Sequence, residues 1–347
     1  MAFEKAYSFD DVLLDPHFTN IKSRKDVDIS TKLYGPYSKH TIDLKVPIIA
    51  ANMDTISEVE MAKTMHELGG LAIIHRYTTI DKQIQMAKEL SNIPSCFSIG
   101  VVGDYFERFV ELYKAGVKRF TIDIAHGASI QMVETINKLR SFANDDIFII
   151  AGNVALGSHA YRLIKEGADC IKIGVGSGGL CTTRTTTGSG RPTLSSVLDT
   201  ANTFKSNGVN ATFIGDGGLK NSGDIAKCLA AGSHAVMVGS LVSGTNECCA
   251  ERQVRFNGIW FKYRGMASRD SRISFKPEDD KTIVPEGEDT WVPSKGSVKD
   301  VVYQLSGGLR SSMTYNDANN LEELRENACF ISISNNGLIE SKPHLKL

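Results

Sequence analysis

Residues 212–240 read TFIGDGGLKNSGDIAKCLAAGSHAVMVGS and hold one complete strand–helix–strand unit. The runs TFIGDG (212–217) and AVMVG (235–239) are short and apolar, and SGDIAKCLAAG (222–232) between them has the apolar spacing of a helix. Because both strands are apolar along their whole length, we expect them to be buried on both faces, as in a parallel sheet.

The same unit recurs along the chain. Further runs of this kind are VPIIAA (46–51), LAIIH (71–75), CFSIGV (96–101), RFTIDI (119–124), IFIIAG (147–152) and CIKIGV (170–175). Most begin roughly 23 to 28 residues after the previous run, and helical patterns fill the intervals. Eight such units within about 200 residues predict an α/β fold, a closed (β/α)8 TIM barrel, with a doubly wound open sheet as the alternative. We expect a single barrel domain over residues 1–347.

Two segments are longer than the repeat requires. CTTRTTTGSGRPTLSSVLDTANTFKSNG (181–208) predicts an extended loop after the sixth strand, and such excess length is typical of a functional loop. Residues 241–296 are rich in charges, glycines and prolines and predict a flap over the barrel mouth after strand eight. Within them, FNGIWFKYRG (256–265) predicts a hairpin with Asn257-Gly258 as its turn.

Composition excludes several classes of function. A net charge of -1 argues against a nucleic-acid binder, and no apolar run approaches the roughly 18 residues of a membrane span. The partner is therefore expected to be a small molecule. Seven scattered cysteines, with no secretory segment at the start, predict reduced thiols in a cytoplasmic protein. The adjacent Cys248 and Cys249 have no second CxxC or histidine at ligand spacing, so the sequence does not predict a metal site there.

The loop IKIGVGSGGLCTTR (171–184) carries the strongest chemical signal. Its glycines permit a close approach of the backbone to a ligand, and Cys181 then follows where a barrel enzyme would present a nucleophile. The alternative is a flexible connection with a buried, inert cysteine.

Polar residues follow most of the predicted strands, at the barrel end where ligands bind. They include Asn52-Met53-Asp54, His75-Arg76, Asp123, Gly127 and Asn153, some of which could equally be helix caps. Two of these segments point to one kind of ligand. They are Asp216-Gly217-Gly218 after strand seven and Gly239-Ser240 after strand eight, where such barrels usually bind a phosphate. A phosphorylated ligand is therefore predicted.

An ordered set of motifs resembles the IMP dehydrogenase/GMP reductase family. The set comprises SFDDVLLDP (8–16), IIAANMDT (48–55), GVGSGGLCTTR (174–184), DGG (216–218), VMVGSL (236–241), YRGM (263–266) and GGLRSSM (307–313), and it covers nearly the whole chain. The resemblance implies a homotetrameric (β/α)8 barrel, a purine nucleotide held by its phosphate, and a covalent bond between Cys181 and purine C2.

The resemblance also implies roles for individual residues. Thr183 and Glu286 would act with Cys181 as proton donor and acid/base partner, and the carbonyls of Gly174, Gly176 and Cys181 would hold a monovalent cation, K⁺. Arg76, Asp123, Gly127 and Arg184 would contact the cofactor. The substrate would be bound by Asn52, Met53, Asp216, Gly217, Gly218, Gly239, Ser240, Tyr263, Gly265, Met266 and Ser268.

Within the family, the chain is more similar to the reductases. Nothing is inserted between the second helix and the third strand, where typical dehydrogenases carry CBS domains, and the flap from Gly265 to Gly287 is short and lacks their Arg-Tyr pair. The resemblance therefore implies NADPH-dependent conversion of GMP to IMP. Gly179 stands where many relatives have a phosphate-binding serine, and Arg76 replaces a reductase lysine.

Three other functions stay open at this point. One is an IMP dehydrogenase without CBS domains, which makes XMP with NAD. Another is a purine-nucleotide-binding regulator without turnover. The third is a flavin-dependent oxidoreductase, since the same phosphate site could hold FMN.

Overall fold

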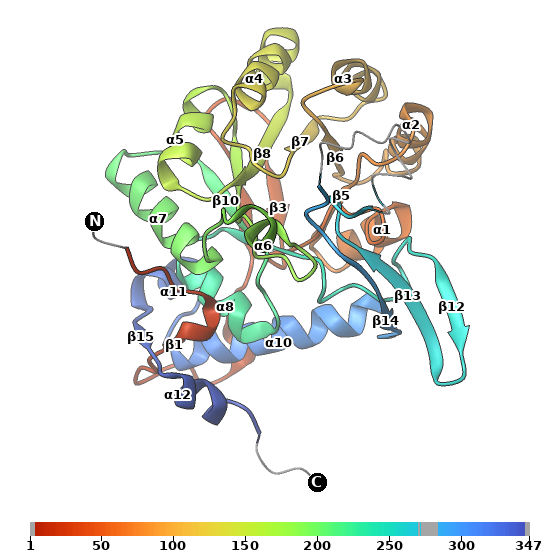
Figure 1. Ribbon diagram of the computed structural model, residues 1–347. Coiled ribbons are helices and arrows are strands. Elements are labelled where there is room, and N and C mark those ends of the chain that lie inside the picture. The colour runs from red at the N-terminus through yellow and green to blue at the C-terminus, as the bar shows by residue number, and fades with distance from the viewer. Residues whose placement is uncertain (1–3, 270, 272–283, 344–347) are drawn as a thin grey trace.

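Eight parallel strands form a closed barrel in the computed structural model, which describes residues 4–269, 271 and 284–343 (Figure 1). The strands follow one another around the barrel, and β11 pairs with β4 through Val238 and Ala50. This closure confirms the predicted (β/α)8 barrel and excludes the open sheet. The strands are β4 (Ile48–Ala50), β5 (Leu71–Ile74), β6 (Cys96–Ile99), β7 (Arg119–Asp123), β8 (Phe148–Val154), β9 (Cys170–Ile173), β10 (Thr212–Asp216) and β11 (Ala235–Val238).

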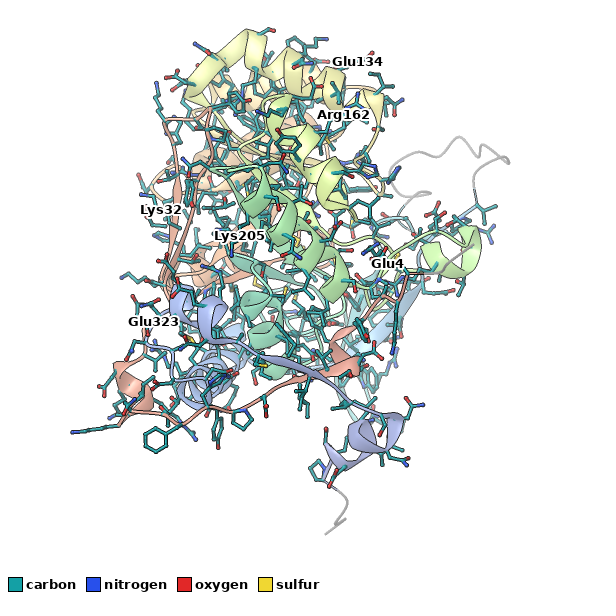
Figure 2. All side chains as sticks on the ribbon, turned by 90° about the vertical axis from the view of Figure 1, so that its left-hand side faces the viewer. Glu4, Lys32, Glu134, Arg162, Lys205 and Glu323 are labelled. Atoms are coloured by element: carbon teal, nitrogen blue, oxygen red, sulfur yellow. The ribbon has the colours of Figure 1, made fainter. Side chains whose placement is uncertain are left out.

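A ring of helices surrounds the barrel, and charged side chains such as Glu134, Arg162 and Lys205 project from it (Figure 2). The helix α10 packs against both α8 and α1, so it fills the last position of the ring. The ring consists of α1 (Val59–Glu67), α2 (Ile80–Glu89), α3 (Tyr105–Lys114), α4 (Ile130–Ala143), α5 (Gly157–Lys165), α7 (Thr193–Ser206), α8 (Ser222–Ala230) and α10 (Val298–Tyr315).

The helix α8 shows how the sequence positions such an element. Asn221 caps it by accepting a hydrogen bond from the backbone N–H of Asp224 at 3.0 Å. Ile225, Cys228 and Leu229 lie on its buried face. Full burial of one such aliphatic side chain contributes about 2 kcal/mol, so packing against the barrel stabilises this short helix more than its intrinsic propensity does.

The strands separate two cores with the two-residue period of a sheet. In β4, Ile48 and Ala50 pack outward against the helices, while Ile49 packs into the barrel interior. The hairpin of β2 (Thr31–Leu33) and β3 (Ile42–Leu44) contributes Leu33 and Ile42 to the interior core. This end of the barrel is therefore filled by apolar side chains, which leaves the opposite end for ligands.

Several small elements were not predicted. The strand β1 (Val12–Leu14) pairs with β15 (Phe330–Ser332), and the short helix α6 (Thr183–Thr187) lies inside the loop expected to be extended. Three 3-10 turns occur at Phe9–Asp11, Arg24–Asp26 and Asn144–Asp146. In the C-terminal region, the run NLEELRENA (320–328) predicts a helix, and α11 (Leu321–Asn327) confirms it; α12 (Asn335–Glu340) was not predicted.

A three-stranded antiparallel sheet projects from the barrel after β11 (Figure 1). It consists of β12 (Arg252–Arg255), β13 (Gly258–Arg264) and β14 (Asp289–Pro293). The hairpin is confirmed, but its turn is formed by Phe256 and Asn257, so the predicted turn at Asn257-Gly258 is one residue too late. The glycine instead begins β13 with a φ of 123°, a conformation that disfavours side chains. Of the predicted flap, residues 270 and 272–283 lie outside the described residues.

In the part of the chain that the structure describes, no helix is both long and apolar enough to cross a bilayer.

Candidate active site

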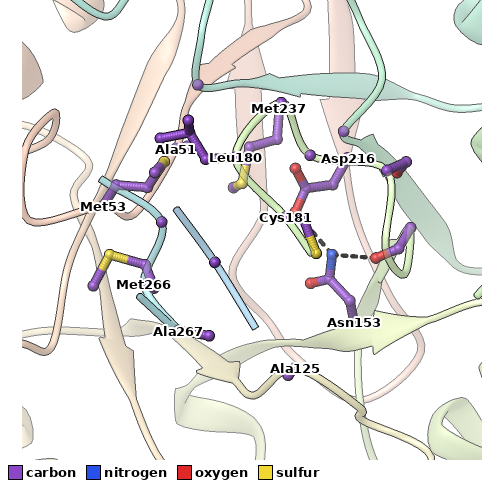
Figure 3. A pocket seen from close by; sticks show the side chains of 18 of the residues that line it. Ala51, Met53, Ala125, Asn153, Leu180, Cys181, Asp216, Met237, Met266 and Ala267 are labelled. Carbon is purple, nitrogen blue, oxygen red and sulfur yellow. Dashed lines mark hydrogen bonds between the residues drawn. The ribbon is translucent and has the colours of Figure 1, made fainter. Parts of the chain in front are cut away.

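A cavity of about 260 Å³ opens at the C-terminal ends of the barrel strands. Figure 3 shows Cys181, Asn153 and Asp216 on one side of it and Met53 and Met266 on the other. The predicted site residues that line it are Asn52, Met53, Arg76, Asp123, Gly174, Gly176, Cys181, Thr183, Asp216, Gly217, Gly218, Gly239, Ser240, Tyr263, Gly265, Met266 and Glu286. The fold thus brings together most of the predicted set from positions spread over more than 230 residues of sequence.

Cys181 is exposed at the cavity and belongs to a chain of three side chains. Its thiol donates to Thr183 Oγ1 at 3.1 Å, and the threonine hydroxyl donates to Glu286 Oε2 at 2.8 Å. Exposure excludes the buried, inert role for Cys181. A thiol therefore lies next to a hydroxyl that a carboxylate orients, and three groups in this order can serve as a nucleophile with a proton relay.

Backbone hydrogen bonds fix the segment of Glu286 against the cysteine loop. Thr182 donates to the carbonyl of Glu286 at 3.0 Å, and Glu288 donates to the carbonyl of Leu180 at 2.9 Å. On its other side, Glu286 donates to the carbonyl of Ala267 at 3.1 Å. The glutamate is thus held by short backbone contacts on both sides of its segment.

A buried lysine connects two carboxylates at the floor of the cavity. Lys172 Nζ donates to Asp123 Oδ1 and to Asp216 Oδ2, each at 2.9 Å, and its side chain is only 4% exposed. Asn153 Nδ2 also donates to Asp216 Oδ2 at 2.9 Å and to the carbonyl of Gly174 at 2.7 Å. These bonds fix the orientation of Asp216, and the bond to Lys172 also holds Asp123.

The charges of this group stabilise one another. Burial by itself lowers the pKa of Lys172, but Asp123 and Asp216 outweigh burial, so the pKa of the lysine is raised. Burial likewise acts to raise the pKa of Asp123, but Lys172 and Arg76 outweigh it and hold that pKa below its usual value. Lys172 and Asp123 are therefore both ionised at neutral pH.

Glycines and small hydroxyl side chains form the end of the cavity near β10 and β11. Gly217 has a φ of 89°, and a Cβ there would lie 2.7 Å from Ser177 Oγ, so only glycine fits. A Cβ on Gly239 would lie 3.0 Å from the hydroxyl oxygen of Tyr263. This crowded, backbone-rich end has the composition of the phosphate site predicted after strands seven and eight.

The wall that carries Met53 and Met266 is held by an ion pair. Arg264 Nε and Nη2 donate to the carboxylate of Asp54, with Nε–Oδ2 at 3.0 Å. The backbone N–H of Asp54 contacts Met266 Sδ at 3.4 Å. The projecting sheet is thereby attached to the end of β4, with two thioether side chains available to pack on a planar base.

Three predicted residues lie outside the cavity wall. Ser268 is buried, and its hydroxyl accepts a hydrogen bond from the backbone of Ser271 at 3.3 Å. Gly127 lies behind Asn153, whose carbonyl accepts its N–H at 2.7 Å. Arg184 borders a second hollow of about 200 Å³ on the other side of the cysteine loop and donates to the carbonyl of Arg191 at 2.6 Å.

The proposed cation ligands fit only in part. Asn153 already donates to the carbonyl of Gly174, so this oxygen offers an ion only its remaining lone pair.

Lys172 is the residue of the site that sequence reasoning missed. It lies in the middle of the run CIKIGV (170–175), where a lysine interrupts an otherwise apolar strand. A charged residue in a strand buried on both faces needs a partner, so this position carried a usable signal.

Comparisons with known proteins agree with this geometry. The family model of the IMP dehydrogenase / GMP reductase domain matches residues 6–344. Inosine-5'-monophosphate dehydrogenase of Nitrosopumilus maritimus is 32% identical over 480 residues, covering 99% of each chain. The same-named protein of Bacillus subtilis is 39% identical over 342 residues, covering 95% of this chain and 68% of its own length.

A solved structure shares the fold over the full chain. It is a GMP reductase variant from Trypanosoma brucei in complex with guanosine 5'-monophosphate, with a TM-score of 0.92 and 26% identity, covering 100% of this chain and 99% of that one. Together with a family model that spans almost every residue, the closed barrel and the cysteine at its mouth lead to one assignment: this chain belongs to the IMP dehydrogenase/GMP reductase family of oxidoreductases, which act on purine nucleotides with a nicotinamide cofactor.

Proposed function

We propose that this protein is a GMP reductase that converts GMP to IMP and ammonia with NADPH. The observation that carries the proposal is the contact series Cys181–Thr183–Glu286, which provides a nucleophile and a proton donor for an amine leaving group at one point of the cavity. Similarity to a GMP reductase bound to GMP supports the same direction.

The residues divide the chemistry into two stages. The Cys181 thiol passes its proton through Thr183 to the Glu286 carboxylate as the sulfur adds to purine C2. Glu286 then returns that proton through Thr183 to the C2 amino group, the C2–N bond breaks, and ammonia leaves, which yields a thioimidate on the cysteine. A bound nicotinamide dinucleotide supplies the hydride that C2 then receives. The carbon–sulfur bond breaks, the electron pair returns to Cys181, and IMP is released.

The walls of the cavity support nucleotide binding in a defined orientation. Asp216, oriented by Lys172 and Asn153, would accept hydrogen bonds from ribose hydroxyls, and Gly218, Gly239 and Ser240 would contact the phosphate. Met53 and Met266 would pack on the purine.

The opposite wall has features that fit a dinucleotide. Arg76 lies near Asp123 and packs its guanidinium over the Tyr77 ring at 4.8 Å. Its Nε is buried and has no hydrogen-bond partner within the described residues. We propose Arg76 and Asp123 as the cofactor contacts.

A dehydrogenase without CBS domains is the second candidate, because the curated relatives at 32% and 39% identity are named inosine-5'-monophosphate dehydrogenase. The alignment with the Nitrosopumilus maritimus protein spans 480 positions, more than the 347 residues of this chain, so that relative carries residues without a counterpart here. For the reductase, we also propose a single-domain, homotetrameric, cytoplasmic enzyme.

Two assays separate the candidates. The protein is incubated with GMP and NADPH, and separately with IMP and NAD, while the absorbance of the reduced cofactor is followed. Consumption of NADPH with release of ammonia supports the reductase, whereas NADH production from IMP alone overturns it.

A Cys181→Ala variant tests whether the thiol is the nucleophile. It should lose turnover and keep GMP binding, while Cys329→Ala, another exposed thiol, should keep both. Wild-type protein that binds GMP without turning over either substrate would instead be a purine-nucleotide-binding regulator.

A further inference from the structure

Three potential metal ligands from distant parts of the chain meet beside the active site. Glu58, His75 and Cys249 each offer one ligand atom, and these atoms lie within 4.8 Å of one another. Glu58 precedes α1, His75 follows β5, and Cys249 lies in the loop between β11 and β12. Sequence spacing gave Cys249 no histidine partner, but closure of the barrel supplies one from a strand far away in the sequence.

The histidine of this cluster is rigidly held and incompletely satisfied. His75 is only 2% exposed, and its Nε2 lies 3.2 Å from Glu58 Oε1. Its Nδ1 is buried without a hydrogen-bond partner in the described part of the chain. An unsatisfied buried ring nitrogen costs free energy, so its presence requires an explanation.

Neighbouring side chains fix the backbone that carries the histidine. Gln83 Nε2 donates to the carbonyl of His75 and to that of Ser98, each at 3.0 Å, and Gln83 Oε1 accepts from Arg108 at 2.9 Å. Such hydrogen bonds around a ligand restrict its motion, as the outer shell of a metal site does.

The other two ligands also have hydrogen-bond partners. Cys249 donates its thiol hydrogen to the carbonyl of Asp54 at 3.3 Å. Glu58 accepts hydrogen bonds from His75 and from Lys82 Nζ, the latter at 2.7 Å, and both end on Oε1. A metal could therefore approach Glu58 through Oε2 while Lys82 keeps its bond.

We propose that Glu58, His75 and Cys249 form a Zn²⁺ site with one position open to water. Thiolate, imidazole and carboxylate are the three ligand types that Zn²⁺ combines, and three protein ligands leave a tetrahedral ion one free position. Hard cations such as Mg²⁺ and Ca²⁺ prefer oxygen ligands and are not expected to bind here. Zn²⁺ binds the thiolate, so the ion must displace the thiol proton of Cys249.

The site would attach the loop after β11 to the ends of β4 and β5. The carbonyl that accepts from Cys249 belongs to Asp54, which also forms the ion pair with Arg264 beside Met266. Zinc binding is therefore expected to stabilise the wall of the active-site cavity without contacting the reacting atoms.

Cobalt substitution tests the proposal independently of catalysis. The full-length protein, freed of metal with a chelator and kept reduced with a phosphine, is titrated with Co²⁺ and then with Zn²⁺. We expect one Co²⁺ per chain, a thiolate-to-cobalt charge-transfer band, displacement by Zn²⁺ and a rise in melting temperature with Zn²⁺.

Matched variants assign the band to one thiol. Cys249→Ser should abolish it and weaken Zn²⁺ binding on the order of 100-fold. Cys248→Ser, at the adjacent buried thiol that donates to the carbonyl of Val242, should keep the band, as should Cys181→Ser. Glu58→Gln should weaken Zn²⁺ binding while leaving every thiol in place. This variant tests the ligand set if Cys249→Ser does not fold.

The proposal is overturned if wild-type protein binds no stoichiometric Co²⁺, if the band survives in Cys249→Ser, or if it disappears only in Cys181→Ser. If the affinity for Zn²⁺ is unchanged in Glu58→Gln, Glu58 is not a ligand and the proposed site is also overturned.

Discussion

Thr183 donates its hydroxyl hydrogen to Glu286 at 2.8 Å, although 103 residues separate the two in the chain. The threonine begins the short helix α6 after Cys181, and the glutamate lies just before β14. The contact therefore joins the cysteine loop to the projecting sheet, and in the proposed reaction it delivers a proton to the leaving ammonia.

Replacement of Glu286 by glutamine removes the proton donor and keeps the shape of the side chain. We expect kcat to fall about 10²-fold to 10⁴-fold with little change in the Kd of GMP, because general acid catalysis contributes that much. Steady-state kinetics with GMP and NADPH, together with calorimetric binding of GMP, measure both quantities.

Glu288→Gln is the control for this variant, since Glu288 lies two residues away and its side chain is exposed. It should behave as wild type. An equal fall of kcat in the two variants would show that activity depends on the negative charge of the segment and not on the contact of Glu286 with Thr183.

Replacement of Lys172 by methionine leaves Asp123 and Asp216 without their shared cation. Because removal of one partner from a buried ion pair is costly, we expect the free energy of unfolding to fall by about 3 kcal/mol and GMP to bind at least about tenfold more weakly. Denaturant unfolding and calorimetry test this, with exposed Lys205→Met as the control. Unchanged GMP affinity would mean that Asp216 does not depend on Lys172 for its orientation.

Gly179→Ser should improve nucleotide binding. A Cβ at this glycine would lie 3.8 Å from that of Ser240, an ordinary contact, so the cavity accepts the new side chain. A hydroxyl donating to a phosphate contributes about 1.5 kcal/mol, and the Kd of GMP should fall roughly tenfold. Gly179→Ala, which adds no donor, should show no such gain in titration calorimetry.

His234 predicts a pH dependence of stability. Burial lowers its pKa from 6.5 to about 3, and it packs edge-on against Phe213. Since the unfolded chain binds a proton on this side chain below pH 6.5 and the folded chain does not, stability is complete above that pH and falls as the pH drops toward 3. In His234→Gln, chemical unfolding at several pH values should show a flatter decline; an unchanged decline would assign the acid sensitivity to other groups.

The barrel could be predicted because its strands are continuous apolar runs with regular spacing. The start of β5 at Leu71 and of β6 at Cys96 follows directly from the residues. The pair β2 and β3 was missed because its strands are only three residues long and alternate, and their partners are decided by packing against the barrel interior.

The candidate site was predictable where function follows from position at a strand end, as at Asp216 and Gly239. It was not predictable where the role depends on contacts across the fold. Lys172 on β9 acquires its role from Asp216 on the adjacent β10 and from Asp123 on β7, two strands away, and His75 meets Cys249 only because β11 and β5 both pair with β4.

The cavity walls come from residues 51 to 287, so no single βα unit holds the nucleotide on its own. A molecule that fills this space contacts many units of the barrel at once. Its binding therefore stabilises the whole barrel against unfolding. If GMP binds there as proposed, GMP at about 100 times its Kd adds about 2.7 kcal/mol to the free energy of unfolding. We then expect the supply of GMP to affect how long the protein survives proteolysis.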